Sequence, residues 1–290
     1  MGIGIALAGG GLKGVAHIGA IKALQELGLQ IDYITGTSSG AMMAALYALG
    51  YTPEEMKQIT KESYKEIIKF RKRVFIKAGI KFLISRKIEV QGIIEGERIE
   101  KIVGKYARQK EIHKMSDIQK KFAMITVDAK STKKVVLTST NDINKEKDVE
   151  YLSNIPIGKA VHASMSFPAI FTPCKYEKYC FIDGGTVDNL PVDTLKSLGA
   201  TKTIAISFEL DEFKGTENLF STILRACDIF SMKDVKNGQD ISDVTIKINA
   251  NEVKLLQIDD VDKTIEIGYN AIMENKEKIL GMVEKVKWKH

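Results

Sequence analysis

The sequence predicts an α/β fold of three layers, in which helices cover both faces of a mainly parallel central sheet. Three observations favour this class. Short apolar runs of strand length alternate with longer stretches of helical periodicity. Glycine-rich turns join the first two strands to the helices that follow them. The contents of 44% hydrophobic and 28% charged residues are ordinary for a globular protein and exclude a disordered or collagen-like chain.

The first fifty residues alternate strand, helix, strand, helix. Residues 3–8 are continuously apolar, which is typical of a strand buried on both faces. Apolar residues then recur at helical spacing over 15–27 and stop at Gly28, a residue type that favours a helix end. A second strand over 31–35 and a second helix over 41–49 follow. Because strands joined by helices run parallel, we expect a parallel sheet.

The same alternation continues to the end of the chain. Thr52 and Pro53 form a strong helix start. The later elements that we expect are paired strands over 122–128 and 134–138, a helix over 156–166, a hairpin around 175–183, a helix over 191–198, a strand over 203–208, a helix over 219–240, a strand over 244–249 and a helix over 259–287.

No internal repeat, low-complexity tract or linker divides the chain. We therefore expect a single domain over 1–290, with a helical insertion or lid over about 61–120 and a C-terminal extension of helices and strand over about 211–290. No window approaches the ~18 apolar residues of a membrane span. The apolar N-terminus lacks the basic residues that open a signal peptide. These features favour a cytoplasmic protein.

Three cysteines are too few for a disulfide framework. We expect Cys174, Cys180 and Cys227 to be reduced thiols, although the first two flank the expected hairpin and could pair in an oxidising compartment.

A Gly-x-Ser-x-Gly pattern lies at the turn from the second strand into the second helix. It contains Gly36, Ser38 and Gly40. In this setting the pattern forms a nucleophile elbow, a turn too sharp for side chains at the flanking positions, which projects the serine hydroxyl from the sheet. The N-terminus of the next helix offers free amides and a dipole that favour negative charge. Ser38 is therefore the candidate nucleophile.

Residues 9–14, Gly-Gly-Gly-Leu-Lys-Gly, form a loop directly after the first strand. Successive glycines leave the backbone unobstructed, so several N–H groups can point at one oxygen of an oxyanion or a phosphate. The loop also matches the dinucleotide pattern Gly-x-Gly-x-x-Gly, but Asp32 precedes the core of the second strand instead of ending it. Val15 stands where a Walker loop needs Lys. A tight turn without a ligand is the remaining alternative.

A serine hydroxyl needs a base, and no histidine has a convincing triad context. His113 lies in a charged stretch, His162 in a helical pattern and His17 early in the first helix, while His290 is the last residue. Asp183 ends an apolar run and is followed by two glycines that let another segment approach. We expect its carboxylate to be the base, and burial that raises its pKa would strengthen it.

Four motifs together resemble the signatures of the patatin-like phospholipases. They are the glycine loop 9–14, the elbow 36–40, the Asp-Gly-Gly triplet 183–185 and the Ala-Ser-x-x-x-Pro block 163–168. Their order and rough spacing are also similar, over about residues 3–210. Lys13 stands where the family often has Arg, which keeps the charge but loses the bidentate fork.

The resemblance implies a patatin-like hydrolase fold and a serine acyl hydrolase that cleaves carboxylic esters of phospholipids or lysophospholipids. It implies a Ser-Asp dyad, an acyl-enzyme intermediate, and no metal or other cofactor. The residues that it implies are Ser38 and Asp183 for catalysis, the amides of Gly9, Gly10, Gly11 and Leu12 for the oxyanion hole, Gly36 and Gly40 for the elbow, and Lys13 as a candidate contact for an anion or headgroup.

The net charge of +6 is concentrated in residues 61–110, which contain fifteen Lys or Arg and six Glu. One interpretation is that these residues solvate helices whose apolar faces join the core. The other is a lid or interfacial segment at an anionic membrane, whose headgroups would be met by Lys69, Arg71, Lys72, Arg73 and Lys77. No nucleic-acid-binding motif accompanies the charge, so we expect no nucleic-acid partner.

Two rival functions remain open. One is an esterase or thioesterase for soluble acyl substrates. The other is a lipid-binding or regulatory protein whose site is catalytically silent. A dinucleotide-binding protein is a more distant alternative, and the sequence contains no indication of an oligomeric state.

Overall fold

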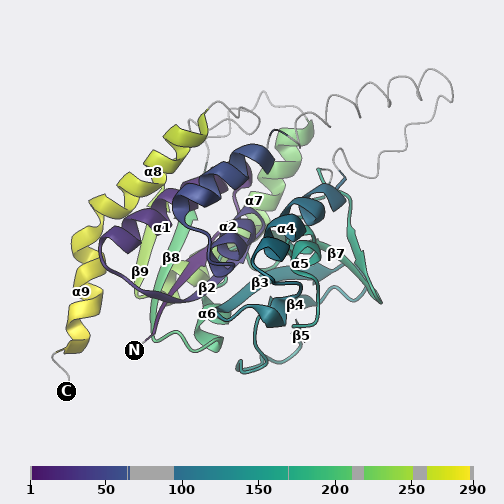
Figure 1. Ribbon diagram of the computed structural model, residues 1–290, viewed down its shortest axis with the longest axis horizontal. Helices are drawn as coiled ribbons and strands as arrows, with labels where there is room; N and C mark the ends of the chain where they lie inside the picture. Colours follow the sequence, from purple (N-terminus) through teal and green to yellow (C-terminus); the bar gives the residue numbers. More distant parts are fainter. Residues whose placement is uncertain are drawn as a thin grey trace.

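The computed structural model describes residues 2–63, 65, 95–168, 170–210, 219–250 and 260–287. The strands in these ranges are β1 Ile3–Leu7, β2 Ile31–Thr37, β3 Lys121–Asp128, β4 Lys134–Thr138, β5 Glu150–Leu152, β6 Cys174–Tyr176, β7 Tyr179–Asp183, β8 Lys202–Phe208 and β9 Val244–Ile248. They form one sheet in the order β5-β4-β3-β2-β1-β8-β9, in which β7 also pairs with β3, and β6 with β7 (Figure 1).

The sheet is mainly parallel, as the sequence predicts. The parallel pairs are β1 with β2, β1 with β8, β2 with β3, β4 with β5 and β8 with β9. The antiparallel pairs are β3 with β4, β3 with β7 and β6 with β7. The short strand β5 was not expected from the sequence, since only three residues carry its pattern.

The helices are α1 Ala16–Glu26, α2 Ser39–Ala48, α4 Glu97–Gln109, α5 Ile157–Ser164, α6 Val192–Ser197, α7 Leu219–Ile241, α8 Val261–Glu274 and α9 Lys276–Lys287. Residues 53–63 are also helical. The described residues also form three turns of 3₁₀ helix, η1 Gly11–Val15, η2 Met115–Asp117 and η3 Gly184–Thr186. The first expected helix therefore opens with a 3₁₀ turn made by the glycine loop.

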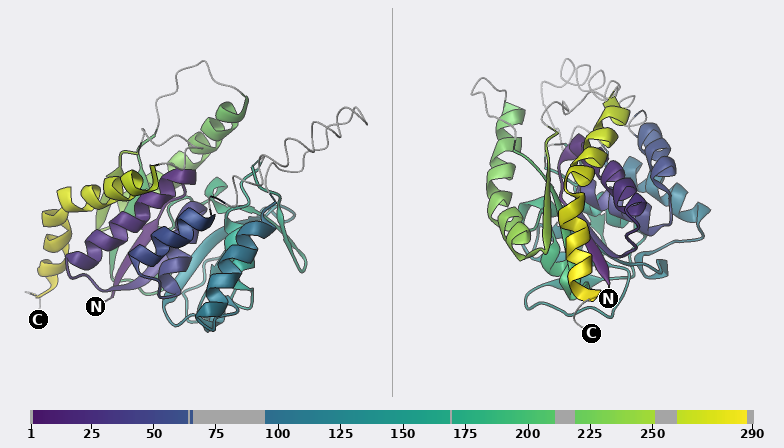
Figure 2. Two further views of the ribbon diagram at one scale, coloured as in Figure 1. Left: turned by 45° about the horizontal axis from the view of Figure 1, so that its top comes forward. Right: turned by 90° about the vertical axis from the view of Figure 1, so that its left-hand side faces the viewer.

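The side chains of β1 show why the fold has three layers. Ile5 and Leu7 belong to the large core beneath α1, α2 and α8, whereas Ala6, and Ala8 just after the strand, belong to a smaller core with Leu195 of α6. Helices cover both faces, so every residue of β1 is buried. Figure 2 shows α7 on one side of the sheet and α1 and α8 on the other.

The expected helix over 259–287 is divided in two where it is described. Asn275 separates α8 from α9, and its side-chain amide donates to the carbonyl of Ala271 at 2.8 Å. An Asn side chain that bonds the nearby backbone competes with helical bonding and favours a helix end.

The basic segment is described only at its two ends. Lys69, Arg71, Lys72, Arg73 and Lys77 lie outside the described residues. In the described part, α4 packs against α5 and buries Ile99, Val103, Tyr106 and Ala107. The helices approach so closely that a Cβ on Gly158 would lie 2.2 Å from the carbonyl oxygen of Glu100. This end of the segment joins the core.

Two further sequence features can be placed in the described ranges. Cys174, Cys180 and Cys227 are free thiols. None of the helices described is both long enough and apolar enough to span a membrane.

Candidate active site

Two strands end against each other on one edge of β3. The other edge is occupied by β4, which pairs with residues 123–127. Parallel β2 follows the free edge until Thr37 lies opposite Ile125, and antiparallel β7 continues it with Asp183 opposite Thr126. Because β2 and β7 run toward each other, the residue after β2 meets the last residue of β7. Those two residues are Ser38 and Asp183.

The structure places the Ser38 hydroxyl and the Asp183 carboxylate in direct contact. Ser38 Oγ donates a hydrogen bond to Asp183 Oδ2 at 2.6 Å. The amide of Gly185 donates to Asp183 Oδ1 at 2.8 Å. Ser38 is half-buried, whereas Asp183 is 1% exposed. Ser38 is therefore partly open to solvent while the carboxylate stays shielded from water.

Burial changes the acidity of this carboxylate. It raises the pKa of Asp183 from 3.8 to about 6, against the opposing effect of the hydrogen bonds from Ser38 and Gly185. At neutral pH the group is still mainly ionised, and it accepts a proton more readily than an ordinary aspartate. This is the combination that a general base requires.

The backbone of Ser38 has the strained geometry of a nucleophile elbow. Its φ of 54° and ψ of −123° lie in a region that residues other than glycine rarely adopt. The flanking glycines are needed because the turn leaves no room beside them. A Cβ on Gly36 would lie 2.5 Å from the carbonyl oxygen of Gly40, and one on Gly40 would lie 2.3 Å from that of Leu7.

The glycine loop lies against the elbow, since a Cβ on Gly9 would be 3.0 Å from Ser38 Cβ. The Gly9 amide donates to Asn189, to its carbonyl oxygen at 3.3 Å and to Oδ1 at 3.1 Å. The Gly10 amide donates to Ser39 Oγ at 3.1 Å. Gly11 and Leu12 begin η1, and within the described ranges their amides have no acceptor.

The four amides expected to form the oxyanion hole are thus in two states. Those of Gly9 and Gly10 are already hydrogen-bonded within the protein, and those of Gly11 and Leu12 are available. Lys13 follows them in η1 and is half-buried.

Asn189 is a residue of the site that sequence reasoning missed. Besides accepting from Gly9, its side-chain amide donates to the Gly9 carbonyl at 3.4 Å. A Cβ on Gly185 would lie 3.1 Å from Asn189 Oδ1. Asn189 therefore links the loop after Asp183 to the glycine loop. In the sequence it looks like an ordinary turn residue, and only its place six residues after Asp183 could have suggested a role.

The histidines do not contact the Ser38 hydroxyl in the described structure. Burial lowers the pKa of His17 to about 4, so this side chain is neutral and its Nε2 donates to the carbonyl of Ala8 at 2.9 Å. His162 is buried between Glu100 and the carbonyl of Thr172. His113 is exposed, and His290 lies outside the described residues.

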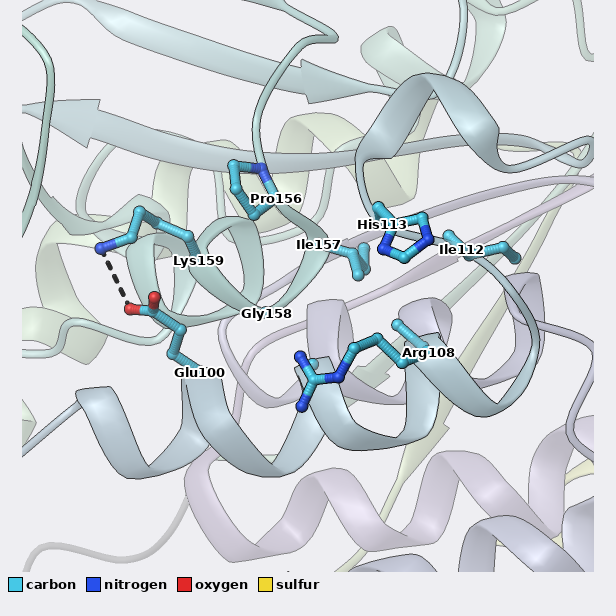
Figure 3. Close-up of a pocket in the computed structure, with 10 residues that line it drawn as sticks. Glu100, Arg108, Ile112, His113, Pro156, Ile157, Gly158 and Lys159 are labelled. Carbon is cyan, nitrogen blue, oxygen red and sulfur yellow. Dashed lines mark ion pairs between the residues drawn. The ribbon is translucent and has the colours of Figure 1, made fainter.

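A pocket of about 110 Å³ lies elsewhere, between α4 and the N-terminal end of α5. Figure 3 shows Lys159 and Glu100 paired beside it, at 3.1 Å. No predicted site residue lines this pocket. Among the residues that the structure describes, no group of His, Cys, Asp and Glu could hold a metal ion.

Comparison with known proteins assigns the chain to a family. A sequence model described as patatin-like phospholipase matches residues 5–196. The chain belongs to the patatin-like phospholipase family, which confirms the resemblance seen in its motifs and places it among the lipid acyl hydrolases.

The relatives range from similar length to much larger proteins. The uncharacterized protein YqhO of Bacillus subtilis is 27% identical over 266 residues, which are 88% of this chain and 87% of that protein. Lysophospholipase nte1 of Aspergillus fumigatus is 30% identical over 204 residues, covering 70% of this chain but 12% of its own length. Human patatin-like phospholipase domain-containing protein 6 is 27% identical over 206 residues, with 70% and 13% covered.

Among solved structures, VipD from Legionella pneumophila aligns with a TM-score of 0.48 and 16% sequence identity. The alignment covers 94% of this chain and 66% of that one.

We expect the burial of Asp183 to lower the free energy of unfolding at pH values where its carboxylate is ionised. Because its pKa is raised to about 6, this group favours the fold below pH 3.8, and the contribution is lost as the pH rises through 6. We expect Asp183→Asn to raise the free energy of unfolding at pH 8 by on the order of 2 kcal/mol over wild type, with no gain near pH 4. Urea unfolding at both pH values measures this. A variant less stable than wild type at pH 8 would contradict it.

Proposed function

We propose that the protein is a serine acyl hydrolase that cleaves carboxylic esters of phospholipids or lysophospholipids through a dyad of Ser38 and Asp183. The hydrogen bond of 2.6 Å from Ser38 Oγ to Asp183 Oδ2 is the observation that carries the proposal. It joins an accessible hydroxyl in an elbow to a buried carboxylate of raised pKa. The lipid substrate is supported by family membership and by relatives whose names describe lysophospholipases.

In the proposed reaction, Ser38 Oγ attacks the ester carbonyl carbon while its proton passes to Asp183 Oδ2. The carbonyl oxygen becomes an oxyanion near the free amides of Gly11 and Leu12, and the Gly10 amide can join them if the Ser39 hydroxyl turns away. Each such donor contributes about 3–4 kcal/mol to transition-state stabilisation in comparable hydrolases.

The tetrahedral intermediate then collapses, the ester C–O bond breaks, and Asp183 gives its proton to the leaving alkoxide. Water attacks the acyl-enzyme in the second half-reaction, with Asp183 again accepting a proton. The fatty acid leaves and Ser38 recovers its hydroxyl proton. Lys13 is the candidate contact for an anionic headgroup.

Removing either dyad group tests the mechanism. We expect Ser38→Ala and Asp183→Asn each to lower kcat on a lysophospholipid and on a chromogenic acyl ester by about 1,000-fold or more, because neither variant can generate the nucleophile. A fluorophosphonate should label the wild type and leave Ser38→Ala unlabelled.

Asp243→Asn is the matched control, since its carboxylate forms an ion pair with Lys202 at 3.1 Å. Lys202 is the first residue of β8, at the end of this strand away from the candidate site. The Asp243→Asn variant should keep activity. Intact hydrolysis by either dyad variant would refute the mechanism, and failure of the folded wild type to react with the fluorophosphonate would favour the silent lipid-binding alternative.

Contact with an anionic membrane is a further part of the proposal. Helix α7 packs against η3, the turn directly after Asp183. It exposes Ile229, Phe230 and Met232 by 56%, 69% and 49%. Large apolar side chains exposed together beside a site are typical of a contact surface. The basic residues between 69 and 77 remain the expected contact for anionic headgroups.

Activity assays with vesicles distinguish an enzyme that contacts membranes from an esterase that acts on soluble substrates. We expect the rate on a lysophospholipid to rise severalfold when it is presented in anionic vesicles. Phe230→Ser should reduce that gain without changing the rate on a monomeric ester, because the Phe230 side chain is largely exposed to solvent. Equal rates on vesicles and on monomeric ester would favour the soluble alternative.

A further inference from the structure

The hydroxyl of Ser164 lies between the backbone of Ser38 and strand β3. Ser164 is the last residue of α5 and is fully buried. Its Oγ donates to the carbonyl oxygen of Ile125 at 2.6 Å and accepts from the amide of Ser38 at 3.1 Å. Since a hydroxyl has one proton, the bond to Ile125 fixes its direction and leaves a lone pair facing the Ser38 amide.

The Ser164 hydroxyl supplies hydrogen-bond partners at the point where the pairing of β2 with β3 ends. The ladder between β2 and β3 ends with Thr37 opposite Ile125. Ser38 then leaves the strand conformation with a φ of 54°, and its amide donates to the Ser164 hydroxyl. The Ser164 hydroxyl bridges the gap between the Ser38 N–H and the Ile125 carbonyl, so both buried polar groups have a partner.

The end of α5 also fixes the second dyad residue. The amide of Asp183 donates to the carbonyl oxygen of Ser166 at 3.1 Å. One helix end therefore contacts the backbones of both Ser38 and Asp183, through the side chain of Ser164 and the main chain of Ser166. Contacts of the end of α5 with both backbones would help to fix the distance between the Ser38 hydroxyl and the Asp183 carboxylate.

We propose that Ser164 is a positioning residue for the nucleophile: its hydroxyl fixes the strained Ser38 backbone so that Oγ faces Asp183. The inference rests on the proposed function. The same hydrogen bond occupies the Ser38 amide, which leaves stabilisation of the oxyanion to the other amides of the site. A residue that acts through the backbone of Ser38 affects the chemical step and not the binding of substrate.

The test compares Ser164→Ala with a serine of matched bonding. Ser139 is buried, donates to the carbonyl of Lys120 at 2.8 Å and accepts from the amide of Phe122 at 2.9 Å, at the far end of β3 from the dyad. Ser139→Ala deletes one donated and one accepted hydrogen bond, as Ser164→Ala does, but at a position that does not bond to Ser38. Ser164→Thr keeps the hydroxyl.

We expect Ser164→Ala to lower kcat by about 10- to 100-fold with little change in KM, because a small displacement of a reacting group has an effect of that size. Ser139→Ala should keep kcat within about twofold while lowering Tm, and Ser164→Thr should restore most of the activity. Should Ser164→Ala not fold, Ser164→Cys keeps the size and weakens both bonds, with a smaller loss of kcat expected.

Wild-type kcat in folded Ser164→Ala, or equal losses in Ser164→Ala and Ser139→Ala, would overturn the inference. Failure of the proposed function is recognised separately, as absence of Ser38-dependent hydrolysis in the wild type. Hydrogen exchange of the Ser38 amide then tests the contact alone. Faster exchange in Ser164→Ala than in Ser139→Ala supports it, and equal exchange contradicts it.

Discussion

The site depends on one constraint, the sharing of a single edge of β3 by two strands that approach from opposite directions. Thr37 and Asp183 pair with adjacent residues of that edge, Ile125 and Thr126. A displacement of either strand by one residue would turn its side chains to the other face and separate Ser38 from Asp183. The strand pairing brings the two backbones together, and the elbow then directs the Ser38 hydroxyl toward the carboxylate.

Several features that are unfavourable for stability follow from this arrangement. Asp183 is ionised inside the protein, where burial raises its pKa. Ser38 has a strained backbone, and Gly36 and Gly40 leave no space beside the turn. Such strain persists only where the surrounding structure over-determines it, and it is concentrated at functional sites. Here the Ser164 hydroxyl bonds the Ser38 amide and Asn189 bonds the glycine loop beside it, both from distant parts of the chain.

Much of this fold could be predicted from the sequence because its elements carry local signals. Buried parallel strands are continuous apolar runs, and glycine marks their turns. The elbow, the glycine loop and Asp183 were found in the same way. Asn189 and the hydroxyls of Ser39 and Ser164 could not be assigned roles, since each acts on residues 29 to 180 positions away. The hydrogen bond from the Gly10 amide to the Ser39 hydroxyl could not be predicted from the sequence either, because it depends on how two turns pack against each other.

The central claim is that a buried carboxylate, and no histidine, activates Ser38. The pH dependence of the rate at which a fluorophosphonate labels Ser38 tests this most directly, because it reports the first nucleophilic step alone. We expect the rate to rise with pH through a single ionisation near pH 6, the value to which burial raises the pKa of Asp183. The same ionisation persisting in Asp183→Asn, or a rate independent of pH between 4 and 8, would contradict the account.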